Sequence, residues 1–487
     1  MKKPFLLIVL LALLVIFLDL VRSVWLGTGE SPSEAYKALL TSPPRTAQDP
    51  KSNAYLLLLG FSASPSADPV HVGHDMWLEV ESDRGHRPFD YGKESRSEMR
   101  IAEETLETLR VKGPAGAINQ LRALADPAKN LLPPHALLID RYRQWVTLPF
   151  DDWGYGHPGT PRLADLYAAH RLYLVEAWAQ DTSTALDRLG KDLAAWRRVL
   201  ANAKTLHLKV FAAAIVDEDA VLVSEALNLP DFDVALLPRL DPLVRPLTPT
   251  ERSLRWPIQN EFVVGVSLFE HPLTSAAAQL QPESEARQRW TAALAGMGAD
   301  SFQSVEQPIP ANMFSRSPMQ KQRTLNIYAA FYEATIKAAD QPNSPFPKLL
   351  DMARLTHRRI LDHFVNPIDN FFASVPEPAW APFADRLLRS DARLKLAALH
   401  ARLHRPGRDL PMASHIVQAG SAFYDPFSGF PMLWSSASDK LYSVGENRGD
   451  DGGDEQRDIP IVLFPSADAD AAQAFIPPRP PEPAKKR

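Results

Sequence analysis

Carboxylate and amide side chains are concentrated in one stretch near the carboxyl end of the chain, residues 445–458. Hard cations such as Ca²⁺ bind about six to eight oxygen atoms, and interspersed glycines let the backbone curl so that its carbonyls point inward. The stretch therefore predicts a calcium loop. Its spacing differs from the EF-hand pattern, and a solvated acidic turn is the alternative interpretation. The candidate ligands are Asn447, Asp450, Asp451, Asp454 and Asp458.

A second candidate metal site lies in the sequence His71-Val-Gly-His74, which is followed by Asp75, Glu79 and Glu81. Two histidines three residues apart on a helix share a face and are able to bind Zn²⁺ if a further ligand comes from elsewhere. The glutamate that a metalloprotease places between its histidines is missing. Two surface or capping histidines are the simpler interpretation, and a periplasmic metal-dependent hydrolase is the functional alternative.

The region around the acidic loop resembles the carboxy-terminal region of type II secretion major pseudopilins. The similar segments are residues 425–431 (DPFSGFP), 441–445 (LYSVG), 450–453 (DDGG) and Asp458-Ile459. The resemblance implies a Ca²⁺ ion that fixes the last strands, with Asn447 and Asp458 at ligand positions and backbone carbonyls near Leu441 and Val444 contributing. The prepilin signal is missing from the amino terminus, so the resemblance indicates a shared module.

The remainder of the chain resembles uncharacterised membrane-anchored proteobacterial helical proteins. The similar parts are residues 53–61, in which Asn-Ala-Tyr precedes Leu-Gly-Phe, Asp68-Pro69 with Gly73, and residues 193–200. This resemblance implies no known activity.

Two further motifs are weaker. Residues 154–159 match the pattern G-x-G-x-x-G, but no apolar strand precedes them and Asp151 and Asp152 would repel a phosphate; a tight surface loop is predicted instead. Asp362 and His363 are neighbours that point in different directions on a helix, so they do not form a dyad. His170 lies within an apolar stripe and is predicted to be a core residue.

The amino terminus predicts a membrane anchor. Lys2 and Lys3 precede an apolar run that begins at Phe5 and continues to Leu26, about the length that spans a bilayer. The basic residues favour a cytoplasmic start, with the bulk of the chain in the periplasm. A signal peptide that is cleaved after Ser23 is the alternative, and it would yield a secreted or periplasmic protein.

The composition limits the function classes. The chain has 487 residues, no cysteine and a formal net charge of −5. Disulfides, thiolate metal sites and cysteine nucleophiles are therefore excluded. There is no basic surplus to attract nucleic acid.

Apolar residues recur at helical spacing along most of the chain, for example at Leu186, Leu189, Leu193, Trp196 and Leu200. We therefore predict a mainly α fold, a multi-helix array or bundle with one amino-terminal transmembrane helix and a small carboxy-terminal β-hairpin module. The predicted divisions are an anchor or signal (1–29), a periplasmic helical domain (30–415), a β module with the acidic loop (416–464) and a disordered Pro/Ala-rich tail (465–487).

Local signals refine this picture. Thr248-Pro249-Thr250-Glu251 has the form of a capping box with proline at the first helical position. Short strand-like runs at residues 432–434 and 441–444 predict a hairpin, and a further strand is expected at 459–464. With no assembled catalytic set, the sequence favours a non-enzymatic scaffold or interaction protein of the inner membrane, with an envelope protein as partner. A calcium-dependent accessory role in secretion or pilus assembly is a further alternative.

Overall fold

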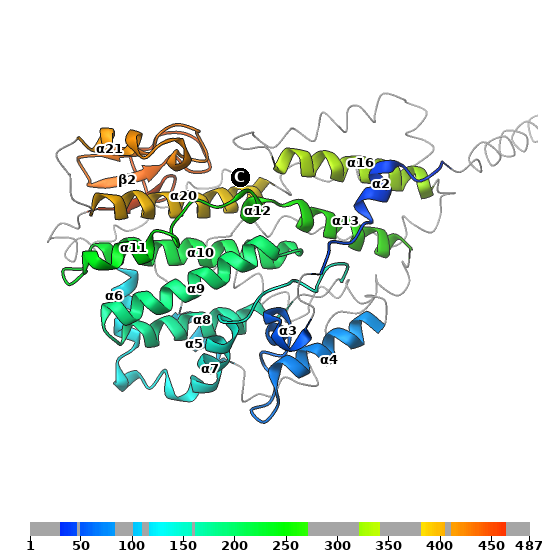
Figure 1. Cartoon of the computed structure of the whole chain (residues 1–487), viewed down its shortest axis with the longest axis horizontal. Coiled ribbons are helices and arrows are strands. Elements are labelled where there is room, and N and C mark those ends of the chain that lie inside the picture. Colours follow the sequence, from blue (N-terminus) through cyan, green and yellow to red (C-terminus); the bar gives the residue numbers. More distant parts are fainter. Residues whose placement is uncertain are drawn as a thin grey trace, which may run out of the picture.

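The computed structural model describes residues 30–45, 49–82, 101–109, 116–157, 161–270, 321–340, 381–404 and 411–463. Most of these residues are helical, and a small antiparallel sheet lies near the carboxyl end (Figure 1). The predicted mainly α fold is confirmed. The predicted anchor, the Asp362-His363 pair and the predicted tail lie outside the described residues. Within the described parts of the chain, no helix has both the length and the apolar character that a membrane span requires.

The bounds of the elements are as follows. The helices are α2 (Glu34–Leu39), α3 (Ala54–Leu59), α4 (Pro69–Ser82), α5 (Glu103–Leu109), α6 (Ala117–Leu124), α7 (Ala136–Trp145), α8 (Leu163–Trp178), α9 (Thr182–Asn202), α10 (Leu206–Leu227), α11 (Leu237–Leu240), α12 (Pro249–Arg252), α13 (Arg255–Glu270), α16 (Lys321–Ala339), α20 (Ala381–Leu403) and α21 (Met412–Gln418). The strands are β1 (Leu433–Ser435), β2 (Lys440–Ser443) and β3 (Ile459–Val462).

Helices α8, α9 and α10 form the centre of the helical body (Figure 1). The predicted stripe of α9 is buried along its whole length, from Leu186 to Leu200. Helix α10 is apolar on nearly all sides and almost entirely buried, as expected for a helix that other helices surround. At the start of α9, the Asp181 carboxylate accepts a hydrogen bond from the Thr184 N–H and so caps the helix. This packing determines where the polar side chains of the three helices meet.

The predicted capping box is confirmed. The Thr248 hydroxyl accepts a hydrogen bond from the Glu251 N–H, and the Glu251 carboxylate accepts one from the Thr248 N–H. The same carboxylate, which is buried, pairs with the buried guanidinium of Arg197 from α9, at 2.9 Å. A local helix signal is thereby joined to a contact that links α12 to the central helices.

The predicted surface loop at residues 151–157 is a correction, because its acidic residues are buried. Asp151 and Asp152 are each 1% exposed, and Asp151 pairs with the Lys204 ammonium at 2.6 Å. The Asp152 carboxylate accepts hydrogen bonds from the backbone N–H groups of Lys204 and Thr205, which precede α10. Backbone donors at the start of a helix satisfy a buried carboxylate, so these acids fasten the loop to α10.

The strands form one antiparallel sheet in the order β1-β2-β3. The predicted hairpin is confirmed as β1 and β2, in which Trp434 faces Leu441, and the predicted third strand pairs with the other edge of β2. Helix α20 lies between α10 and the sheet (Figure 1). Its Leu396 and Leu399 share one buried cluster with Leu441 and Ile461 of the sheet. The β module therefore builds its core on a helix that precedes residue 416.

Candidate functional site

The acidic loop connects β2 to β3, and its glycines allow the tight path that this requires. Gly445 has φ of +66°, and a Cβ atom there would lie 2.4 Å from the Arg457 carbonyl oxygen. Gly452 and Gly453 also have positive φ. Only glycine adopts this conformation without steric cost, so the loop is folded back against its own end.

Most loop carboxylates are satisfied by neighbours in the sequence. The Asn447 amide donates to the Asp451 carboxylate at 2.6 Å, and the Arg457 guanidinium donates to the same carboxylate at 3.0 Å. The Asp450 carboxylate accepts from the Tyr442 hydroxyl at 2.9 Å. Asp454 accepts from the Gln456 N–H at 2.8 Å. These contacts preform the loop, but they also occupy oxygen atoms that a cation would need.

Asp458 differs from the other loop acids because it is only 1% exposed. One carboxylate oxygen, Oδ2, accepts a hydrogen bond from the Gly453 N–H at 2.7 Å. The other, Oδ1, is buried and has no hydrogen-bond partner among the described residues. Burial raises the pKa of Asp458, and the nearby charges of Asp451 and Asp450 raise it further. An orphaned carboxylate oxygen surrounded by negative charge is an arrangement that a cation would stabilise.

The Asp-Pro motif that precedes the sheet is anchored to the end of β2. The carboxylate of Asp425, which is buried, accepts hydrogen bonds from the Ser443 hydroxyl at 2.8 Å and from the Val444 N–H at 3.1 Å. It also accepts from the Phe427 N–H within its own turn. Asp425 therefore positions the strand end at which the acidic loop begins.

The two predicted histidine ligands lie on α4. His71 is exposed, and its Nε2 lies 3.5 Å from the carboxylate of Asp75. The ring of the half-buried His74 stacks on Trp77, with ring centroids 6.3 Å apart. Glu81 is directed elsewhere, toward His157 at 3.2 Å. In the described chain, neither histidine belongs to a group of three metal-ligating side chains.

Comparison with protein families, curated proteins and solved structures finds no match.

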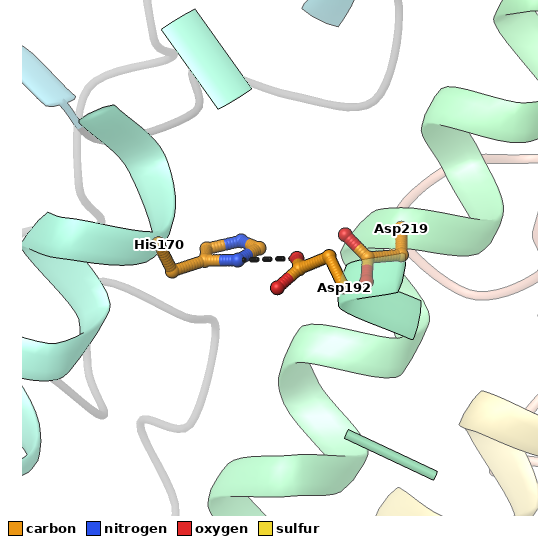
Figure 2. A group of neighbouring side chains, drawn as sticks. All are labelled: His170, Asp192 and Asp219. Atoms are coloured by element: carbon orange, nitrogen blue, oxygen red, sulfur yellow. Dashed lines mark ion pairs between the residues drawn. The ribbon is translucent and has the colours of Figure 1, made fainter. Parts of the chain in front are cut away.

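The described residues do contain one group of three ligand-type side chains, His170, Asp192 and Asp219, which come from α8, α9 and α10 (Figure 2). All three are completely buried. His170 Nδ1 lies 2.7 Å from the Asp192 carboxylate, and the Asp219 side chain extends toward Asp192 from the neighbouring helix (Figure 2). His170 is thus a core residue, as predicted, but its partners are charged.

Aromatic donors hold Asp192 in place. The Tyr142 hydroxyl donates a short hydrogen bond to Asp192 Oδ1, and the indole N–H of Trp196 donates to the Tyr142 oxygen at 2.8 Å. Burial, followed by the adjacent Asp192 carboxylate, raises the pKa of Tyr142 well above its ordinary value, so the phenol keeps its proton and acts as a donor.

Further charges lie at the edge of the cluster. The Arg171 guanidinium is 3.6 Å from the Glu218 carboxylate, which also lies 3.9 Å from His170 Nε2. Burial raises the pKa of Asp219 well above its ordinary value, and the charges of Asp192 and Glu218 add to this effect. A charged Asp219 therefore requires a cation close to it.

Periodicity did not identify this cluster as a site. A signal was nevertheless present, because Asp192 directly precedes Leu193 within the apolar stripe of α9, and Asp219 interrupts an apolar segment of α10. A carboxylate on the buried face of a helix requires a partner. The sequence does not specify which partner, because it comes from another helix.

Proposed function

We propose that this chain is a non-enzymatic scaffold or interaction protein of the bacterial cell envelope, and that its carboxy-terminal loop binds a structural Ca²⁺ ion. The observation that carries the calcium part is the buried Asp458 Oδ1, which has no hydrogen-bond partner in the described structure and lies near acidic side chains. The residues that would hold the ion are Asn447, Asp450, Asp451 and Asp458, together with backbone carbonyls near the end of β2. Arg457 would have to release Asp451.

The scaffold part rests on three features. The apolar amino-terminal segment favours anchoring in the inner membrane with the bulk of the chain in the periplasm. The described helices build an extensive core from local stripes. His71 and His74, the predicted ligands of a hydrolase, have no third ligand near them within the described residues, so the arrangement supports no hydrolytic site there.

The calcium proposal is tested by calorimetric titration of CaCl₂ into the full chain in mild detergent. We expect saturable binding and a Ca²⁺-dependent rise in the melting temperature, because an ion that binds only the folded state stabilises it. Asp458→Asn should abolish both. The matched control is Glu455→Gln, an exposed loop acid that pairs with Lys440, and it should retain both. Absence of heat and of a melting shift in the unmodified protein would refute the calcium site.

The envelope proposal is tested by extraction of bacterial membranes with alkaline carbonate and by protease treatment of spheroplasts. We expect the chain to stay with the membrane and to be cleaved from the periplasmic side. Release as a soluble periplasmic protein would favour the cleaved signal, and protection from protease in spheroplasts would contradict the proposed topology.

A further inference from the structure

The side chains of His170, Asp192 and Asp219 converge from three different helices in the centre of the body (Figure 2). Each offers one ligand atom, and these atoms all lie within 4.8 Å of one another. Zinc–nitrogen and zinc–oxygen bonds of about 2.0–2.2 Å place neighbouring ligand atoms roughly 3 Å apart. Small movements of side chains would therefore bring all three atoms to one ion.

Unsatisfied atoms in the cluster point to a missing positive group. Neither carboxylate oxygen of Asp219 has a hydrogen-bond partner in the described structure, and the same holds for His170 Nε2. Asp219 is completely buried, so bulk water cannot solvate it. Fully buried carboxylates are normally paired, hydrogen-bonded or bound to a metal ion.

The charges are consistent with a divalent ion. Three carboxylates, those of Asp192, Asp219 and Glu218, face one permanent positive charge, the Arg171 guanidinium. With a neutral imidazole at His170, a divalent cation cancels the remaining two negative charges. The donor set of one nitrogen and two carboxylate oxygens suits Zn²⁺ and other divalent transition metals, whereas Ca²⁺ and Mg²⁺ prefer oxygen alone.

We infer that His170, Asp192 and Asp219 form a buried binding site for a divalent transition-metal ion that joins α8, α9 and α10. The Tyr142 hydroxyl orients Asp192 and the Trp196 indole orients Tyr142, as expected for groups that support metal ligands. Because the ligands are inaccessible in the folded chain, the ion enters during folding. The site is separate from the proposed calcium loop and does not depend on it.

The experiment uses the full chain, produced in cells grown with added ZnSO₄ and purified without chelator. Metal content is measured by mass spectrometry, and unfolding is followed by circular dichroism with and without a chelator present during unfolding. We expect stoichiometric zinc in the unmodified protein and background zinc in Asp219→Asn, which keeps the shape of the side chain and removes its charge. Heating with a chelator should make unfolding of the unmodified protein irreversible or lower its midpoint.

Two controls separate this site from others. His71→Ala and Asp458→Asn should both keep stoichiometric zinc, because the first changes an exposed surface histidine and the second changes the calcium loop. If Asp219→Asn does not fold, Tyr142→Phe provides the test: it leaves the three ligands and should release zinc to a chelator roughly 10- to 100-fold more readily.

The inference is overturned if the unmodified protein contains no more zinc than Asp219→Asn. It is also overturned if the zinc is lost in His71→Ala and retained in Asp219→Asn. Either result would assign the cluster to a proton shared between Asp192 and Asp219 next to a charged His170.

Discussion

The helical body and the carboxy-terminal sheet both contain concentrated acidic groups, but they hold them in different ways. In the body, His170, Asp192 and Asp219 come from separate helices and are completely buried. In the loop, Asp450 and Asp454 accept hydrogen bonds from neighbours in the sequence while they remain exposed. Charges in a dry core interact strongly and are costly to leave unpaired, whereas exposed charges are screened by solvent. Substitutions should therefore have large effects in the body and small ones in the loop.

The largest effect is expected for Arg197→Met. The Arg197 guanidinium is buried, pairs with Glu251 and donates to the carbonyls of Leu243, Arg245 and Pro246. Removal of one partner from a buried pair leaves the other uncompensated, so we expect a loss of about 3 kcal/mol in the free energy of unfolding. Urea unfolding followed by circular dichroism measures this loss.

The matched control for that prediction is Arg245→Met, because Arg245 pairs with the same Glu251 carboxylate at 2.9 Å but is 45% exposed in its side chain. We expect a loss of less than about 1 kcal/mol. Equal losses in the two variants would show that burial does not distinguish the two arginines and would break the comparison.

An intermediate, pH-dependent effect is expected for Lys209→Met. Lys209 is buried in α10, where its ammonium donates to the Leu200 carbonyl, and burial lowers its pKa to about 7. Below pH 7 the amine is charged in both the folded and the unfolded state, so the full cost of burying the charge is present. Between pH 7 and its ordinary value, the folded protein releases the proton first, and stability rises with pH.

The unmodified protein should therefore gain on the order of 2 kcal/mol relative to Lys209→Met between pH 6 and pH 9. Urea midpoints at the two pH values measure the difference. Lys337→Met is the control, because Lys337 is exposed on α16, and it should show the same pH dependence as the unmodified protein. A Lys209→Met variant with an unchanged pH dependence would contradict the burial of a titrating amine.

The smallest effect is expected for Asp450→Asn in the loop. The amide oxygen of asparagine still accepts from the Tyr442 hydroxyl and the Gly452 N–H, so without Ca²⁺ the loss should be below about 0.5 kcal/mol. With Ca²⁺, the variant should show a smaller melting shift than the unmodified protein. A loss of several kcal/mol in the absence of Ca²⁺ would show that the loop depends on this charge as strongly as the body depends on its own.

Much of the fold was predictable from the sequence. The stripe from Leu186 to Leu200 identified α9, the capping box at Thr248 and Glu251 was found as predicted, and the hairpin and third strand appear at the expected places. These features depend on interactions within a few residues: hydrogen bonds of one helical turn, caps, and turns between adjacent strands. The composition of the acidic loop was also visible, together with its position between strands.

Only the tertiary structure decided how distant polar residues meet. The sequence placed His170 in a core but did not indicate Asp192 and Asp219 as its neighbours, and it predicted a surface loop where Asp151 and Asp152 are buried. Periodicity identifies which face of a helix is apolar, but the angle and offset at which helices pack depend on side chains from the whole core. Partners between helices follow from that packing, so the cluster at His170 is a property of the folded chain.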